Sequence, residues 1–241
     1  MVKIHGLVNQ KGGVGKTTLA VNLAAVTHSV LVGSNSPLHT ETQGPSPVLV
    51  VSTDPQASSV WWSGRVEERG GLPFDFAQIS EPGQLRQLRS LEYAHIFVDT
   101  PGSLDDEKIL RDALEQCDDV VVPMEPEPLC FIPTENTIKN VLVPMGIHYT
   151  VVVNNWDPRD GLPDLKETAE FISANGWPMA DTVVRRYKLH TRASAEGIVV
   201  TQYPKNRTAA EAREDFFRLA LELGYGGVPG QRAGSVHPVE A

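Results

Sequence analysis

The sequence predicts an α/β fold in which a mostly parallel, twisted sheet is flanked by helices on both faces. Three observations lead to this prediction. Short apolar runs recur along the chain, stretches with helical spacing separate them, and polar residues follow the runs. The runs are continuous rather than alternating, which is typical of strands buried on both faces of a parallel sheet. Alternation of strand and helix favours crossover connections between parallel neighbours.

The expected strands are five continuous runs and one alternating run. The continuous runs lie at 3–9, 48–54, 95–102, 119–125 and 149–155. The alternating run "FDFAQI" at 74–79 predicts an edge strand. The stretch "SVLVGSNSP" is similar to the second run, but we place the second strand at 48–54 because Asp54 supplies a carboxylate there.

Helical spacing of apolar residues predicts the segments between the strands. Four helices are expected at about 15–28, 105–116, 132–143 and 163–175. A last helix is expected at 207–224, ending at Gly224, because glycine commonly terminates helices.

We expect residues 1–225 to form a single domain. Segment 33–47 is interpreted as a surface insertion, because a connection to the next strand needs only a few residues. The tail 226–241 is rich in Gly and Pro and is expected to be disordered.

Composition excludes several classes of protein. No apolar run reaches the length of a membrane span, no signal peptide is recognisable, and there are only two cysteines, so we expect a cytoplasmic protein without a membrane partner. The net charge of −9 argues against a protein wrapped in nucleic acid. However, 183–218 carries eight Lys and Arg against four Asp and Glu, so a local basic face is expected.

The stretch "NQKGGVGKTT" at 9–18 has the pattern of a phosphate-binding loop. Its glycines let successive backbone N–H groups face a phosphate, and the following helix adds its positive N-terminal end. Lys16 is expected to reach the β- and γ-phosphates, Thr17 to bind Mg²⁺, and Thr18 to touch the α-phosphate. The expected nucleotide-binding residues of the loop are Lys11, Gly12, Gly13, Val14, Gly15, Lys16, Thr17 and Thr18.

A second motif, "HIFVDTPG", complements the loop. Asp99 follows an apolar strand and is expected to hold Mg²⁺ through water or to brace Thr17. The turn 100–102 then leaves the strand where it could sense the γ-phosphate. Ligands of open parallel sheets bind beyond the carboxyl ends of the strands. The polar residues at these ends are Asn9, Asp54, Asp99, Glu125 and Asn154.

Four motifs together resemble the ParA-type partition ATPases, in the deviant-Walker group that also contains MinD and the nitrogenase iron protein. They are "NQKGGVGKTT", "STDPQAS", "FVDTPG" and "VVTQYPKNRTAAEA". The resemblance covers nearly the whole chain except 33–47 and the tail. It implies a deviant-Walker P-loop NTPase fold, slow ATP hydrolysis with Mg²⁺ that a partner stimulates, and a short form without an N-terminal DNA-reading domain.

The resemblance also gives a role to the additional lysine of the loop. Lys11 matches the signature lysine, which crosses to the partner subunit when two subunits sandwich two ATP molecules. Two cations on one loop repel each other unless phosphate charge lies between them. A cation supplied in trans acts like an arginine finger, which is worth roughly 10³–10⁵ in rate. We therefore expect an ATP-dependent homodimer, with Lys11, Lys16, Asp54 and Asp99 as the catalytic residues.

Other residues take their expected roles from the same resemblance. Asp54 matches the carboxylate that positions the attacking water, although Ser52 stands where the family usually has another Asp. Asn154 and Pro204 match residues near adenine. The basic residues that correspond to DNA contacts in the family are Arg186, Lys188 and Arg207.

The resulting hypothesis is a DNA-segregation ATPase. Its ATP dimer binds non-specific DNA and so associates with the nucleoid. A centromere-binding partner protein, ParB- or ParG-like, then stimulates hydrolysis and releases it. Three alternatives stay open: a ParA-like positioner of a protein cargo, a MinD-like ATPase on a membrane surface, and a metabolic or redox enzyme of the same superfamily. The membrane class needs a terminal amphipathic basic helix, which this tail lacks. The partner, the centromere site, polymerisation and the effect of Ser52 stay open.

Overall fold

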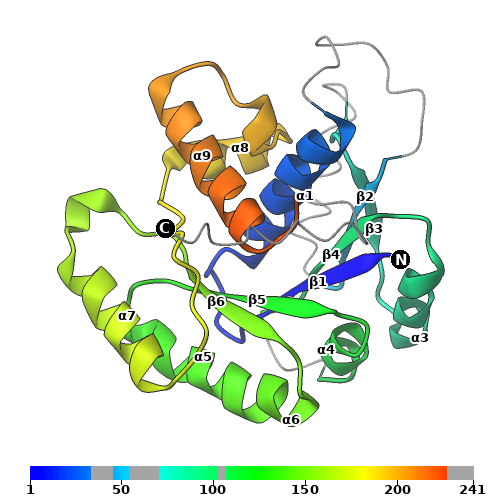
Figure 1. Cartoon of the computed structure of the whole chain (residues 1–241), viewed down its shortest axis with the longest axis horizontal. Helices are drawn as coiled ribbons and strands as arrows, with labels where there is room; N and C mark the ends of the chain where they lie inside the picture. Colours follow the sequence, from blue (N-terminus) through cyan, green and yellow to red (C-terminus); the bar gives the residue numbers. More distant parts are fainter. Residues whose placement is uncertain (34–45, 55–70, 103–106, 227–241) are drawn as a thin grey trace, which may run out of the picture.

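The computed structural model describes residues 1–33, 46–54, 71–102 and 107–226, and the statements below concern these residues. They form one six-stranded sheet in the order β3-β2-β4-β1-β5-β6, and every strand pair is parallel. The predicted fold class is therefore confirmed (Figure 1). The strands are β1 (Lys3–Leu7), β2 (Val48–Ser52), β3 (Asp75–Gln78), β4 (His95–Asp99), β5 (Asp119–Met124) and β6 (Tyr149–Val153).

Helices cover both faces of the sheet, as expected (Figure 1). One face carries α1 (Lys16–Val32), α8 (Lys188–Glu196) and α9 (Arg207–Glu222). The other face carries α3 (Pro82–Leu85), α4 (Glu107–Leu114), α5 (Phe131–Thr137), α6 (Val143–Met145) and α7 (Pro163–Ala174). A π-helical turn, Ile138–Leu142, joins α5 to α6. Short 3₁₀ turns lie at Arg86–Ser90, Pro128–Cys130, Pro158–Asp160 and Val200–Gln202.

The core lies on both sides of this sheet and fixes α1 against it. Leu19 and Leu23 of α1 are fully buried and belong to one cluster with Leu7 and Phe97 of the sheet and Phe216 of α9. Burial of a side chain of this size contributes roughly 1.5–3 kcal/mol. Because α1 is held between the sheet and α9, the loop that precedes it has a fixed position.

The register brings the carboxyl ends of the central strands to one edge. Leu7 at the end of β1 pairs with Asp99 at the end of β4 and with Val121 of β5. Ser52 at the end of β2 also pairs with Asp99. The loop after β1 therefore begins beside the carboxylate that ends β4.

Most predicted elements are confirmed, with differences at their ends. The helix predicted at 15–28 continues to Val32 and stops at Gly33, whose φ of 83° favours glycine. Residues 30–32 are therefore helical, which confirms the placement of the second strand at 48–54. The edge strand predicted at 74–79 is β3, at the edge of the sheet. Most of the predicted insertion and tail, at 34–45 and 227–241, lies outside the described residues.

An irregular segment extends the sheet beyond β6. Residues 178–186 run parallel to β6 through bridges at Met179 and Arg185. Side chains of α9 close the outer edge of this segment, because Glu222 accepts hydrogen bonds from two of its N–H groups, at 2.6 and 3.0 Å. Asp215 accepts a third, from the Arg185 N–H at 3.1 Å. This arrangement was not predicted from the sequence. No helix of the described residues has both the length and the apolar character needed to cross a membrane.

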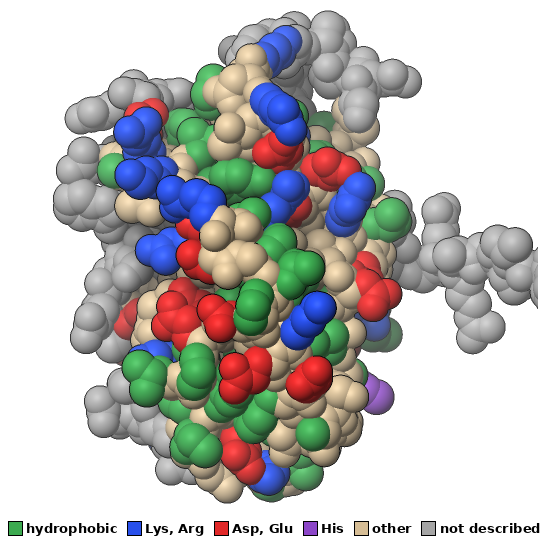
Figure 2. All heavy atoms as spheres, turned by 90° about the vertical axis from the view of Figure 1, so that its left-hand side faces the viewer, with side chains coloured by type: hydrophobic (Ala, Val, Ile, Leu, Met, Phe, Trp, Pro, Cys, Tyr) green, Lys and Arg blue, Asp and Glu red, His purple; other side chains and the backbone are tan. Residues whose placement is uncertain are grey.

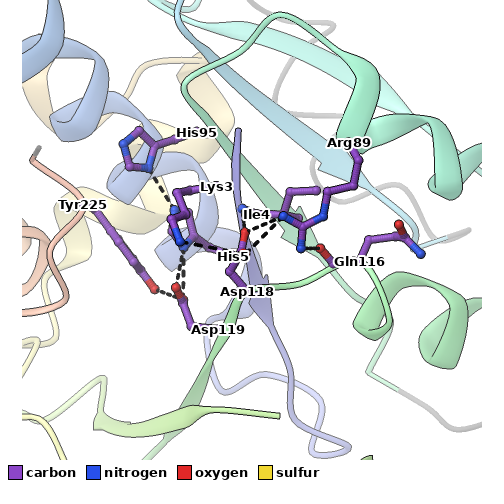
Figure 3. A network of polar contacts seen from close by, with 9 residues as sticks. All are labelled: Lys3, Ile4, His5, Arg89, His95, Gln116, Asp118, Asp119 and Tyr225. Carbon is purple, nitrogen blue, oxygen red and sulfur yellow. Dashed lines mark hydrogen bonds and ion pairs between the residues drawn. The ribbon is translucent and has the colours of Figure 1, made fainter. Parts of the chain in front are cut away.

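A buried polar network connects the end of the described chain to the amino ends of the central strands (Figure 3). The Tyr225 hydroxyl donates to Asp119 Oδ1 at 2.6 Å, and His5 Nδ1 lies 2.9 Å from Asp119 Oδ2. His5 Nε2 lies 2.9 Å from His95 Nδ1. Burial raises the pKa of Asp119, but the hydrogen bonds and the charge of its partners lower it more, so the pKa lies below its ordinary value. The network therefore anchors the chain after α9 to β1, β4 and β5.

Replacing Tyr225 with Phe is expected to lower the free energy of unfolding by about 1–2 kcal/mol, because the carboxylate loses a charge-assisted hydrogen bond. The difference from wild type should be complete above about pH 4 and shrink as the pH falls through the depressed pKa of Asp119. Urea denaturation at several pH values measures it. Tyr149→Phe is the matched control, because no described residue bonds its partly exposed hydroxyl. Equal stability of the two variants would contradict the anchoring role.

Candidate functional site

A glycine-rich loop connects β1 to α1 at the carboxyl edge of the sheet. Gly13 and Gly15 have φ angles of 86° and 87°, in the left-handed region that favours glycine. Helix α1 begins directly after Gly15, and no side chain caps its first N–H groups. Backbone N–H groups and the positive helix end therefore point into the same loop, which is the arrangement that binds phosphate.

Lys16 is buried at the base of this loop. Its Nζ donates to the Asn9 carbonyl at 2.9 Å and to the Lys11 carbonyl at 3.3 Å. Burial lowers the pKa of Lys16, and the carboxylates of Asp99 and Asp54 partly oppose this shift. A buried cation held by carbonyls, with two carboxylates near it, is suited to an anionic ligand that brings compensating charge.

Thr17 and Asp99 meet as the sequence predicts. The Thr17 hydroxyl donates to Asp99 Oδ2 at 2.7 Å, and Asp99 is almost fully buried. A hydroxyl and a carboxylate beside a phosphate-binding loop are the oxygen ligands that Mg²⁺ prefers, so the residues fit this ion. Asp54, half-buried after β2, is close enough for its charge to act on Lys16.

The turn after Asp99 packs against the glycine-rich loop. A Cβ on Gly102 would lie 3.3 Å from Lys16 Nζ and 3.5 Å from the Gly12 Cα. The Thr100 hydroxyl donates to the Leu7 carbonyl at 2.7 Å and holds the start of the turn. A change at the terminal phosphate position would therefore reach this turn directly, and its predicted sensing role stays a prediction.

Helix α5 holds the start of the loop, a feature that the sequence did not reveal. Asn9 Nδ2 donates to Thr134 Oγ1 at 2.9 Å, and the Gln10 N–H donates to Thr137 Oγ1 at 3.0 Å. Asn9 Oδ1 accepts a hydrogen bond from the Lys11 N–H at 2.9 Å. The Lys11 side chain is half-exposed, and its ammonium group forms no ion pair with any described residue. The two lysines of the loop thus differ, one buried and one turned to the surface.

The two residues expected near adenine, Asn154 and Pro204, lie in different surroundings, and their contact with adenine stays a prediction. Asn154 is buried, its Nδ2 donates to the Val14 carbonyl at 2.7 Å, and a Cβ on Gly15 would approach it to 2.3 Å. It supports the loop, whereas its neighbour Asn155 lines the cavity and donates to Glu125 Oε1 at 2.6 Å. Asn155 has a φ of 59°, which turns the two side chains in different directions.

A cavity of about 910 Å³ opens between the loop and α8. Gly13, Gly15 and Thr18 lie on its loop side. Glu125, Asn155 and Asp157 lie after the strand ends, Lys188 and Arg192 lie in α8, and Arg186 lies just before it. Pro204 is exposed and does not line this cavity, and its expected position beside adenine stays a prediction.

The basic segment divides into structural and exposed residues. Arg185 donates to both oxygens of Asp215 at 2.7–3.1 Å, and Arg213 donates to the carbonyls of Val200 and Tyr203 at 3.2 and 3.1 Å. These two arginines are therefore committed to the fold. Arg207 is 92% exposed at the start of α9.

Figure 2 shows Lys and Arg gathered on the upper part of one face, where α8 and α9 lie, above a region richer in Asp and Glu. Of the three predicted DNA residues, Arg186 and Lys188 line the cavity, and Arg207 lies on the outer surface of α9. Their predicted contact with DNA stays a prediction.

Comparison with known proteins finds relatives along nearly the whole chain. The chain is 35% identical over 224 residues to "Maintenance of carboxysome distribution protein A" of Gloeobacter kilaueensis, covering 92% of this chain and 94% of that one. It is 28% identical over 257 residues to "Chromosome-partitioning ATPase Soj" of Thermus thermophilus, covering 92% and 95%. The MinD protein of Pyrococcus horikoshii solved with Mg-ADP shares the fold, with a TM-score of 0.65, 18% identity and coverage of 92% and 96%. No family model matches the chain.

Proposed function

The chain is an ATPase of the ParA/MinD superfamily that uses ATP and Mg²⁺, and on this premise we propose that it is a nucleotide-timed positioning protein that distributes a protein cargo. The observation that carries the proposal is the 35% identity, over 92% of the chain, to a carboxysome distribution protein. The sequence alone favoured DNA segregation and kept cargo positioning as the alternative. The similarity favours the alternative, and the weaker similarity to Soj keeps segregation as the second candidate.

The first step of the proposed cycle is nucleotide binding. Residues 12–18 cradle the phosphates with backbone N–H groups, and Lys16 reaches the terminal ones. Thr17 and Asp99, whose side chains are hydrogen-bonded at 2.7 Å, are the residues that would hold Mg²⁺, Asp99 through water. The base lies toward Asn155 on the cavity side of β6, while Asn154 keeps the loop in shape through Val14.

The second step is dimerisation with hydrolysis. Lys11 is turned to the surface beside the loop and reaches the phosphates bound by a second copy. Asp54 orients the attacking water, and its distance from Lys16 is short enough for their charges to interact. Mg²⁺ supplies neutralisation of the charge that develops on the phosphates. A subunit without its partner lacks the second cation, so hydrolysis depends on assembly.

The third step is attachment to a surface that the cargo follows, for which we propose non-specific DNA. Arg186 and Lys188 share the cavity with the glycine-rich loop, so nucleotide occupancy changes the charge beside them. Arg207 extends the basic surface on α9. Such contacts go to phosphates, do not read sequence and weaken steeply with salt. A partner protein on the cargo then stimulates hydrolysis and releases the dimer.

Arg207→Glu is expected to weaken ATP-dependent DNA binding by about tenfold, because one phosphate contact per subunit is reversed in sign. ATP hydrolysis without DNA should stay at the wild-type rate, since Arg207 lies outside the cavity. The measurement is a DNA titration at fixed salt with ATP, with ADP and without nucleotide. Arg218→Glu is the matched control, because Arg218 is also an exposed arginine of α9 and forms an ion pair with Glu214, four residues earlier. An equal effect of both changes would indicate only a change of net charge.

Deleting the gene in its host separates the two candidate functions. Loss of even spacing of a protein cargo, with unchanged inheritance of plasmids and chromosome, supports the positioning function. Random inheritance of a DNA molecule with normal distribution of protein assemblies would instead support the segregation function.

A further inference from the structure

Two large apolar side chains are exposed beside the glycine-rich loop. Leu129 is 76% exposed and Ile132 is 62% exposed. Leu129 lies in the 3₁₀ turn Pro128–Cys130, and Ile132 lies in the first turn of α5. They are three positions apart along a continuous helical path, so they share one face. Single exposed apolar residues are common, but a pair on one face at the edge of a functional site indicates contact with another surface.

Charged groups of both signs lie around this pair. The side-chain ligand atoms of Glu125, Glu127 and Cys130 all lie within 4.8 Å of one another. The charges of these two glutamates and of Lys11 all act on the Cys130 thiol, which lies between Leu129 and Ile132 in the chain. The apolar pair, the two carboxylates and the surface lysine therefore belong to one edge of the molecule.

Hydrogen bonds connect this edge of the molecule to the glycine-rich loop. Two hydrogen bonds, from Asn9 to Thr134 and from the Gln10 N–H to Thr137, connect α5 to the residues directly before Lys11. A change in the position of the loop therefore acts directly on α5, the helix that carries Ile132.

We propose that Leu129 and Ile132 form the apolar anchor of the ATP-dependent contact between two copies of this chain. The inference rests on the proposed function, in which Lys11 crosses to a second copy. A two-fold interface needs a surface that is complementary to itself. An apolar centre flanked by a cation and by carboxylates meets this need, because rotation about the axis sets the positive side of one copy against the negative side of the other.

The carboxylates strengthen the argument for a second copy as the occupant. Among the described residues, neither Glu125 nor Glu127 forms an ion pair, although their oxygens lie close together. A second copy brings a cation past these carboxylates, since its Lys11 approaches along this edge on its way to the phosphates. Two apolar side chains per copy bury too little area to hold a dimer alone. The contact therefore needs the phosphates as well, which makes it dependent on ATP.

The test is the double variant Leu129→Ser/Ile132→Ser. Both side chains are exposed, so folding should be unaffected, and thermal unfolding checks this. Leu221→Ser is the matched control, because Leu221 is 78% exposed on α9, on the other face of the sheet. Sedimentation with a non-hydrolysable ATP analogue should show dimerisation weakened on the order of tenfold or more in the double variant and unchanged in the control. Binding of the analogue to the monomer, measured at high dilution, should stay as in wild type.

The possible outcomes distinguish failure of the apolar anchor from failure of the ATP-dependent dimer. If wild type and the double variant dimerise equally, the anchor is refuted while the proposed ATP-dependent switch stands. If the double variant dimerises normally but a partner protein no longer stimulates it, this face is a partner site and the inference is wrong. If wild type itself stays monomeric with the analogue, the dimer switch and the inference are both overturned.

Discussion

Replacing Lys11 with alanine is expected to leave ATP bound and to reduce its hydrolysis on the order of 10³-fold or more. The side chain is half-exposed and forms no ion pair with a described residue of its own subunit, so its removal does not disturb the loop. The loss arises because each active site lacks the cation from the other subunit. Steady-state phosphate release and calorimetric ATP titration measure the two effects.

Lys139→Ala is the control for this change. Lys139 is also a surface lysine near the same edge, but it pairs with Glu135 four residues earlier. It should keep the wild-type hydrolysis rate. Hydrolysis at the wild-type rate by the Lys11 variant would refute the proposal that Lys11 acts on ATP in the other subunit. Loss of ATP binding would mean that Lys11 contacts the ATP of its own subunit.

Replacing Lys16 with methionine is expected to weaken ATP binding by about 100-fold or more, because the cation at the terminal phosphates is lost. The same change should leave the nucleotide-free protein as stable as wild type or more stable. The reason is that Lys16 is buried and burial lowers its pKa. Below this lowered pKa, the buried Lys16 ammonium destabilises the folded protein to its full extent. This destabilisation decreases as the pH rises from the lowered pKa to the ordinary pKa of lysine.

Thermal unfolding with and without ATP separates these two effects. ATP should raise the unfolding temperature of wild type, and it should raise that of the Lys16 variant much less at the same ATP concentration. A variant that ATP still stabilises as strongly as wild type would contradict the assignment of the phosphate-binding loop.

The fold could be predicted well because its strands are buried on both faces. The runs that become β1, β2, β4, β5 and β6 are continuous and apolar, a pattern that few other structures produce. The end of α1 was predicted too early, because "SVLV" has strand propensity, whereas in the structure these residues continue the helix as far as Gly33. Helix α8 was not predicted, because its short amphipathic pattern does not stand out among basic residues.

The sequence predicted part of the arrangement of the site, and the features that it did not show have physical causes. The hydrogen bond between Thr17 and Asp99 was predicted, because each residue belongs to a recognisable motif and the two motifs lie at the same edge of a parallel sheet. Asn154 and Asn155 are adjacent and identical in type, so only the backbone angle of Asn155 shows which of them lines the cavity. Arg185 reads as a surface cation in the sequence, but its partner Asp215 is thirty residues away and becomes a neighbour only in the fold.

The central claim is that ATP joins two subunits through a lysine that each lends to the other. The most direct test is the molar mass of the wild-type protein, measured by light scattering at high concentration with Mg-ATP and with Mg-ADP. We predict twice the 26.3 kDa chain mass with ATP and the single mass with ADP. A single mass in both nucleotides would contradict the account.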